Sequence, residues 1–192
     1  MKKTYDFKAV SRFDMRDPRL KLLNKLNAVA FVCIVVCCVA GAILNYCLRM
    51  RGAAGGMYFV YIICGFAACL IYPYIHEFAH AFAIMAIKRQ VPSVRFGKLA
   101  AYCGSSDIFF GKAQYCFVAL FPFVFYCVLL IPLCVLLPAM FFPIPFMPLA
   151  YNVFGSFADF YMINAALQSP RNSVIVDCGT ELTVYAPLLR KK

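Results

Sequence analysis

Residues Ile71 to Ile84 read IYPYIHEFAHAFAI, an apolar run that is interrupted by His76, Glu77 and His80. These are the two histidines of the 192-residue chain and one of its two glutamates. An apolar medium disfavours such groups unless they are hydrogen-bonded, paired or bound to a ligand. The stretch therefore marks either a set of satisfied core residues or a binding site.

The spacing of these residues indicates a metal site. His76 and His80 are four residues apart, so on an α-helix they share a face, and Glu77 stands beside them. Zinc hydrolases use this His-Glu-x-x-His spacing, with two imidazoles on the metal and the glutamate as the base that deprotonates water. No lysine or arginine lies between residues 57 and 87 to pair with Glu77. We predict one Zn²⁺ ion at His76 and His80, with Glu77 as the catalytic residue.

A catalytic zinc ion needs a third protein ligand, and the chain has no further histidine. An acidic residue is the natural candidate, and outside the His-Glu run only Asp159 lies within an apolar segment. We expect Asp159 to be the third ligand and keep Asp107 and Asp177 as alternatives. A carboxyl group that is hydrogen-bonded between helices, and serves only packing, is the competing interpretation.

Two more polar residues share the segment of Asp159. Asn152, Ser156 and Asp159 follow at i, i+4 and i+7, which places them in one stripe on a continuous helix. Asn152 and Ser156 could hydrogen-bond the metal ligands or stabilise an oxyanion. Hydrogen bonding between helices explains the two residues equally well.

The composition predicts a membrane protein. The chain is 64% hydrophobic and 14% charged, and residues 27–48, 57–87, 114–137 and 146–167 each have the ~20 residues of apolar helix that cross a bilayer. We predict an all-α integral membrane protein with four transmembrane helices and one membrane domain, residues 27–167. The eleven cysteines lack paired spacing, so small packing residues are favoured over a thiolate metal site.

The basic residues predict the orientation of the chain in the membrane. Lysine and arginine number eight before the first span, two in the 49–56 loop, five between 88 and 113 and four in the tail. The positive-inside rule then places the central loop and both termini in the cytoplasm, and the protein in the cytoplasmic membrane. The net charge of +11 is explained by this topology and by anionic lipid headgroups, so we expect no nucleic-acid partner.

The segments outside the spans have their own expected structures. We expect residues 1–26 to be a basic lead that lies on the membrane surface. In the loop, VRFGKLAAYC and DIFFGK are strand-like runs on either side of Gly104, Ser105 and Ser106, so a β-hairpin is expected, whose edge could hold an extended peptide. The cytoplasmic tail, residues 168–192, has two strand-like runs around Cys178 and Gly179 and is a second expected hairpin.

The chain resembles a known family of small bacterial membrane proteins described as zincin peptidases. The likeness rests on HEFAH at 76–80, on NVFGSFADFYM around Asp159 and on VIVDCGTELTVYAP in the tail. It is also similar, more distantly, to the site-2 protease class of intramembrane zinc metalloproteases. The resemblance implies zinc held by His76, His80 and Asp159, with Glu77 as base, and a membrane-associated peptide as substrate. The sequence departs from the site-2 proteases in that Asp159 is followed by Phe160 rather than glycine.

Three functions are compatible with these residues. The first is a zinc peptidase that cleaves membrane protein substrates within or beside the lipid bilayer. The second is a transporter of zinc or protons, and the third is an inactive scaffold that binds zinc for folding. The sequence does not indicate the oligomeric state.

Overall fold

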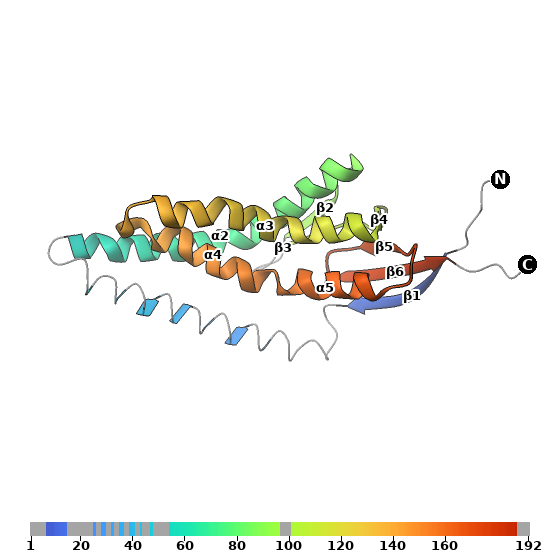
Figure 1. Cartoon of the computed structure of the whole chain (residues 1–192), viewed down its shortest axis with the longest axis horizontal. Helices are drawn as coiled ribbons and strands as arrows, with labels where there is room; N and C mark the ends of the chain where they lie inside the picture. The colour runs from blue at the N-terminus through green and yellow to red at the C-terminus, as the bar shows by residue number, and fades with distance from the viewer. Residues whose placement is uncertain are drawn as a thin grey trace, which may run out of the picture. The chain divides into compact units, whose positions relative to one another are not determined.

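The computed structural model describes Phe7–Asp14, residues 54–96 and residues 101–187, together with isolated positions between 25 and 47. Figure 1 shows the elements along the chain. They are β1 (Phe7–Asp14), α2 (Ala54–Lys88), β2 (Ser93–Phe96), β3 (Ala101–Gly104), β4 (Phe109–Gly111), α3 (Lys112–Leu136), the 3₁₀ helix η2 (Ala139–Phe141), α4 (Pro143–Gly155), α5 (Phe157–Gln168), β5 (Val174–Asp177) and β6 (Glu181–Pro187).

These elements form two compact units, and α2 and α3 each contribute to both. The first, here called the sheet unit, contains the described residues of Met1–Lys21, Glu77–Pro122 and Ala158–Lys192. The second, the helical unit, contains those of Leu22–His76 and Phe123–Phe157.

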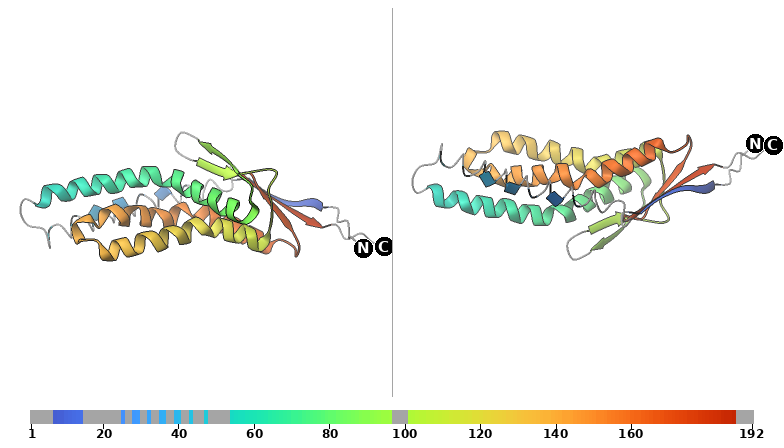
Figure 2. Two further views of the ribbon diagram at one scale, coloured as in Figure 1. Left: turned by 90° about the horizontal axis from the view of Figure 1, so that it is seen from above. Right: turned by 90° about the horizontal axis from the view of Figure 1, so that it is seen from below.

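The sheet unit contains two antiparallel sheets. Four strands pair in the order β1-β6-β5-β4, so the first and last described strands of the chain are neighbours. Strands β2 and β3 pair with each other alone, and both views of Figure 2 show them as a separate hairpin. Gly179 adopts a positive φ of 86° in the tight turn between β5 and β6, a conformation that glycine adopts without steric cost.

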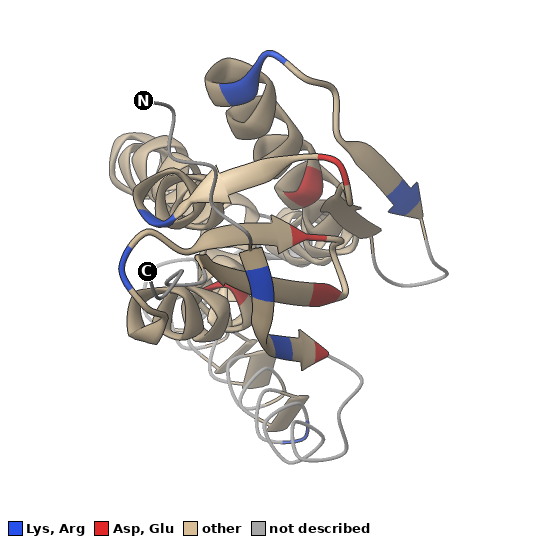
Figure 3. Cartoon of the chain, turned by 90° about the vertical axis from the view of Figure 1, so that its right-hand side faces the viewer, with Lys and Arg blue, Asp and Glu red and all other residues tan. Residues whose placement is uncertain are grey.

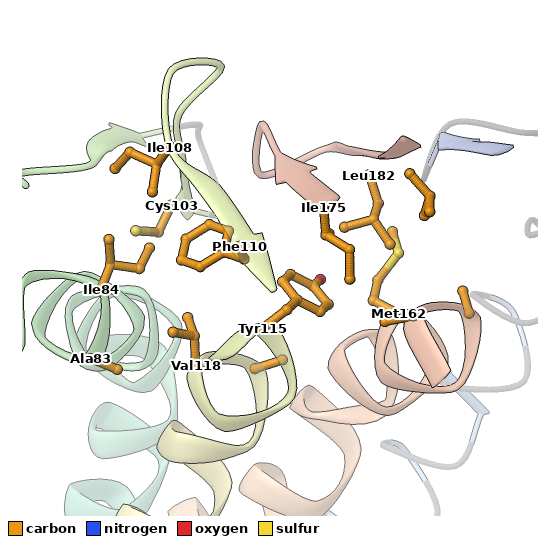
Figure 4. Close-up of a cluster of buried hydrophobic side chains, with 14 of the residues drawn as sticks. Ala83, Ile84, Cys103, Ile108, Phe110, Tyr115, Val118, Met162, Ile175 and Leu182 are labelled. Atoms are coloured by element: carbon orange, nitrogen blue, oxygen red, sulfur yellow. The ribbon is translucent and has the colours of Figure 1, made fainter. Parts of the chain in front are cut away.

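Helix ends and strands enclose the core of the sheet unit. Figure 4 shows side chains from α2, α3 and α5 pointing toward those of the strands above them. The buried residues include Ile84 of α2, Val118 of α3, Met162 of α5, and Ile175 and Leu182 of the sheet. Each helix thus presents one apolar face to the sheet, the general way in which both kinds of element bury hydrophobic surface.

The helical unit has a small aromatic centre. Tyr72 of α2 is buried against Tyr126 and Leu130 of α3. Most of the unit's large apolar side chains point outward instead; Leu70, Val128 and Leu136 are 73%, 70% and 79% exposed. The helices of this unit therefore bury little of their own apolar surface.

The expectation of an all-α fold is wrong, because the structure is mixed α/β. Residues expected to form a lead on the membrane surface instead contribute β1, which pairs with β6 from Phe7 opposite Pro187 to Asp14 opposite Glu181. Such pairing joins residues more than 160 positions apart. No local pattern in a short exposed strand encodes its distant partner, because strand preference depends on the neighbouring strands.

The predicted fourth span is also wrong, since residues 146–167 do not form one helix. Helix α4 ends at Gly155 and α5 begins at Phe157, with Ser156 between them. A Cβ atom on Gly155 would lie 3.0 Å from the ring of Tyr72, so glycine permits a close approach at this break. The polar stripe expected for a continuous helix is therefore divided between two helices.

The expected hairpins have different outcomes. The tail hairpin is confirmed, because β5 and β6 pair around Cys178 and Gly179. The loop contains a hairpin with different partners: β2 and β3 both come from VRFGKLAAYC, whereas β4, from DIFFGK, pairs with β5. The loop prediction is therefore wrong in its strand partners, because β4 pairs with a strand from a distant part of the chain.

Two helices in the described part of the chain are long and apolar enough to cross a membrane. They are Met57–Lys88, with a mean hydropathy of 1.8, and Lys112–Leu136, with 2.6. They correspond to the second and third predicted spans. Only isolated positions of the first predicted span, residues 27–48, are described, so this span stays a prediction, and α4 and α5 are each shorter than a span.

Gly104 offers a test of how the hairpin joins the four-stranded sheet. A Cβ atom there would lie 2.4 Å from the Gly179 nitrogen and 2.6 Å from the Asp177 carbonyl oxygen. Gly104→Ala should therefore lower the free energy of unfolding by roughly 1–3 kcal/mol, a typical cost of overpacking. Gly111→Ala is the control, because its Cβ would meet only the Gln114 side chain, at 3.9 Å. Equal melting temperatures for the two variants in detergent would contradict the close packing of Gly104.

Candidate metal centre

The two histidines lie on α2 and are both buried. His76 and His80 are one helical turn apart, so the helix backbone fixes one relative to the other. Glu77 follows His76 directly and begins the part of α2 that belongs to the sheet unit. The helix continues through Pro73 and past both histidines to Lys88.

A backbone carbonyl orients His80. Its Nδ1 lies 3.0 Å from the carbonyl oxygen of Val118 on α3. A carbonyl oxygen only accepts hydrogen bonds, so Nδ1 carries the hydrogen and donates it. The other ring nitrogen, Nε2, lies 3.3 Å from Oδ1 of Asp159. His80 thus presents Nε2 to the carboxylate that the sequence singled out.

Asp159 lies in the first turn of α5, three residues after the break at Ser156. The N-terminal end of a helix carries a partial positive charge, which stabilises a carboxylate in that turn. The separate start of α5 therefore gives Asp159 a favourable electrostatic position that a continuous helix would not provide.

His76, His80 and Asp159 form the only group of potential metal ligands found among the described residues. Each of the three offers one ligand atom, and these atoms lie within 4.8 Å of one another. Two ligands ~2.0–2.1 Å from a shared tetrahedral metal are about 3.4 Å apart. The 3.3 Å between His80 and Asp159 matches this separation, and two imidazoles with a carboxylate are a donor set that suits zinc.

A cavity of about 60 Å³ adjoins this group within the sheet unit. A space of that size holds several water-sized groups, since each needs on the order of 10–15 Å³. Glu77, His80 and Asp159 all line this cavity. Its lining residues are Glu77, His80, Ile84, Cys103, Phe110, Tyr115, Val118, Ala119, Asp159, Asp177 and Gly179.

Asp177 is a second carboxylate of the cavity. Its side chain accepts hydrogen bonds from the Tyr115 hydroxyl at 3.0 Å and from the Gly179 backbone at 2.7 Å. Burial raises the pKa of Asp177 above its usual range, and these two hydrogen bonds oppose the shift. Asp177 is not part of the three-residue ligand group, and Asp107, the other alternative, is exposed on its loop.

Cys103 also lines the cavity, from strand β3. Burial raises the pKa of its thiol to about 12, and the carboxylate of Glu77 adds to the effect. The thiolate form, which binds metals, is therefore disfavoured at Cys103. No cysteine belongs to the ligand group formed by the described residues.

Asn152 and Ser156 lie in the helical unit and line no part of the cavity. Asn152 is fully buried; its Oδ1 accepts a hydrogen bond from the Tyr72 hydroxyl and its Nδ2 donates one to the Phe123 carbonyl. The Ser156 hydroxyl is buried with no hydrogen-bond partner among the described residues. The proposed oxyanion role of these two residues stays a prediction.

Sequence reasoning missed Tyr72 and Tyr115. The Tyr72 hydroxyl lies 2.6 Å from Nδ1 of His76. A signal was present, because Tyr72, His76 and His80 recur every four residues and so share one helix face. Tyr115 had no such signal, since its partner Asp177 is 62 residues away and only tertiary structure brings them together.

A helix that carries His-Glu-x-x-His, together with a carboxylate from a second helix, defines a zincin-type metal centre. A family model described as "Putative zincin peptidase" matches residues 69–174, more than half of the chain, and the protein belongs to this family. The membership supports a metallopeptidase that uses zinc. No curated protein and no solved structure matches the chain significantly.

Metal analysis of single variants tests the ligand group. His76→Ala, His80→Ala and Asp159→Asn should each lose stoichiometric zinc, because each removes a ligand atom. Asp177→Asn is the matched control: it neutralises a carboxylate of the same cavity that lies outside the group, and it should retain zinc. Loss of zinc from Asp177→Asn together with full retention by Asp159→Asn would assign the third ligand to Asp177 instead.

Proposed function

We propose that the protein is a membrane-embedded zinc peptidase, similar in type to the site-2 proteases, that cleaves peptide bonds of membrane-associated polypeptides. The observation that supports this most directly is the placement of Glu77 on the same cavity as His80 and Asp159. The base and two of the proposed zinc ligands therefore face the same small volume.

The residues have distinct roles in this proposal. His76, His80 and Asp159 hold one zinc ion, which when bound polarises a carbonyl group and lowers the pKa of water to about 7. Glu77 accepts a proton from the attacking water and delivers it to the amine that leaves. The apolar side of the cavity, which includes Ile84, Phe110 and Val118, limits access of bulk water and strengthens these electrostatic interactions.

Membrane embedding is supported by the surface of the helical unit. Residues 54–76 and 123–157 contain no lysine, arginine, aspartate or glutamate. In the most apolar 18-residue stretches of α2 and α3, only 22% and 28% of the residues are buried. A core helix of a soluble domain, in contrast, buries most of its apolar face. An uncharged surface of exposed leucine, valine and isoleucine matches lipid better than water.

The charged residues support an orientation for this arrangement. Figure 3 shows lysine, arginine, aspartate and glutamate on strands, loops and helices of the sheet unit. The basic residues outnumber the acidic ones, so the positive-inside rule favours a cytoplasmic sheet unit. Strands β1 and β6 pair in that unit, which is consistent with both termini on the cytoplasmic side of the cytoplasmic membrane.

The β2–β3 hairpin supports a peptide as substrate. Its strand β3 contains Cys103, which lines the same cavity as Glu77. A hairpin this close to the base can hold a substrate in an extended conformation by strand addition. Extension is required, because the peptide bonds of an inserted helix are hydrogen-bonded internally and closed to attack.

Glu77→Gln distinguishes the peptidase from a transporter that uses the same ligands. The variant should retain zinc and lose hydrolysis by at least ~100-fold, as expected for removal of a general base. The measurement is mass spectrometry of new termini in a mixture of apolar peptides, with the protein in lipid nanodiscs. Asp107→Asn, on an exposed loop, should cut like the wild type.

Two other outcomes would contradict the peptidase. Unchanged cleavage by Glu77→Gln would remove Glu77 from the chemistry. Zinc uptake into vesicles that survives Glu77→Gln, with no cleavage by the zinc-loaded wild type, would support the transport alternative.

Cysteine labelling tests the membrane location. Cys64 lies on α2 in the helical unit and Cys178 in the turn between β5 and β6, and both are exposed. In lipid nanodiscs a charged maleimide should label Cys178 and spare Cys64, because lipid covers the latter; after unfolding it should label both. Peptide mapping measures the two sites. Equal labelling of both in the folded protein would contradict lipid contact at Cys64.

A further inference from the structure

A tyrosine lies one helical turn before the first histidine of the metal centre. Tyr72 is 3% exposed, and its hydroxyl oxygen lies 2.6 Å from Nδ1 of His76 and 2.7 Å from Oδ1 of Asn152. All three residues belong to the helical unit. The hydroxyl thus stands between a proposed zinc ligand and a buried amide, in a chain of two short hydrogen bonds.

The directions of these hydrogen bonds follow from the partners of Asn152. Its Nδ2 donates to the Phe123 carbonyl oxygen at 3.1 Å and lies 3.7 Å from the Cys127 sulfur. A carbonyl oxygen cannot donate, so the amide group must face it, and Oδ1 of Asn152 must face Tyr72. Oδ1 therefore accepts the single hydroxyl hydrogen of Tyr72.

The consequence for His76 is a defined tautomer. Since the hydroxyl hydrogen of Tyr72 is directed to Asn152, the tyrosine oxygen can only accept a hydrogen bond from His76. Nδ1 of His76 must then carry the hydrogen, which leaves the lone pair of the neutral imidazole on Nε2. His80 reaches the same tautomer by donating from Nδ1 to the Val118 carbonyl.

The packing around Tyr72 holds the hydroxyl in place. The rings of Tyr126 and Tyr151 lie 4.8 and 5.0 Å from the ring of Tyr72, centroid to centroid. Gly155 approaches the same ring so closely that an added Cβ would lie 3.0 Å from it. A ring enclosed in this way has little freedom to move, so the Tyr72 oxygen is a hydrogen-bond acceptor in a fixed position.

We propose that Tyr72 and Asn152 are positioning residues that fix His76 in the tautomer whose Nε2 binds zinc, and that they thereby raise the affinity of the centre. The proposal rests on the proposed function only in taking His76 as a zinc ligand. Such outer partners of metal-bound histidines typically change metal affinity by about 10–100-fold. Neither residue contacts the reacting atoms in this assignment.

Substitutions of the two residues have different predicted effects on the tautomer. Tyr72→Phe removes the acceptor, so Nδ1 of His76 loses its partner and both tautomers become populated. Asn152→Ala releases the hydroxyl hydrogen of Tyr72, which can then be donated to Nδ1 of His76. The hydrogen of the imidazole moves to Nε2, the wrong nitrogen for the metal. A purely structural role of either residue would not produce this reversal.

The experiment is ¹⁵N NMR of the metal-free protein labelled at histidine, followed by zinc titration. Because the chain has two histidines, a His80→Gln variant assigns the His76 signals. We expect hydrogen on Nδ1 of His76 in the wild type, a mixture in Tyr72→Phe and hydrogen on Nε2 in Asn152→Ala. Zinc affinity should fall about 10–100-fold in both variants.

Tyr126→Phe is the matched control. Its ring stacks on His76 with an interplanar angle of 10°, and its buried hydroxyl has no hydrogen-bond partner among the residues that the structure describes, so the variant should keep the wild-type tautomer and affinity. Should Tyr72→Phe fail to fold, Asn152→Ala and the wild type still decide the tautomer.

The readouts separate this proposal from the proposed function. A wild type that binds no zinc would refute the peptidase but leave the tautomer measurement intact. The positioning role is overturned if Tyr72→Phe and Asn152→Ala show the His76 tautomer of Tyr126→Phe. It is equally overturned if all three variants bind zinc as the wild type does.

Discussion

The arrangement around the site depends on one constraint: two imidazoles are buried in an apolar helix, and each needs a hydrogen-bond partner. His80 forms a hydrogen bond with the Val118 carbonyl of α3, and His76 forms one with the Tyr72 hydroxyl of its own helix. A buried polar atom without a partner costs on the order of 1–3 kcal/mol, so these contacts restrict how the neighbouring elements pack. The same hydrogen bonds orient both imidazole rings, so the contacts that stabilise the fold also prepare the proposed centre to bind a metal ion.

The break between α4 and α5 lies next to the packing around Tyr72. Tyr72 needs space beside Gly155, and the chain leaves the helical path one residue later, at Ser156. Helix α5 can then begin anew, with Asp159 in its first turn, where the helix dipole favours a carboxylate. A residue without a side chain at position 155 thus permits the close aromatic packing around Tyr72, four residues before the third proposed ligand.

The strands contribute to the site by closing one side of the cavity. Cys103 of β3, Asp177 at the end of β5 and Gly179 in the following turn all line it. The Ser105 backbone donates to the Asp177 carbonyl at 2.8 Å, which ties the hairpin to the four-stranded sheet. Residues of the loop and the tail are therefore part of the surroundings of Glu77, and this proposed base faces strands as well as helices.

The sequence by itself determined the helices α2 and α3, the tail hairpin and the zincin motif. Long apolar runs and i, i+4 spacing involve residues that are close in the sequence, so they can be recognised without the tertiary structure. Only the tertiary structure decided the four-stranded sheet, the break at Ser156, the cavity and the partners of the imidazoles. Each of these depends on residues far apart in the chain, such as Phe7 with Pro187 or Tyr72 with Asn152, because strand pairing and the satisfaction of buried polar groups are set by neighbours in space rather than in sequence.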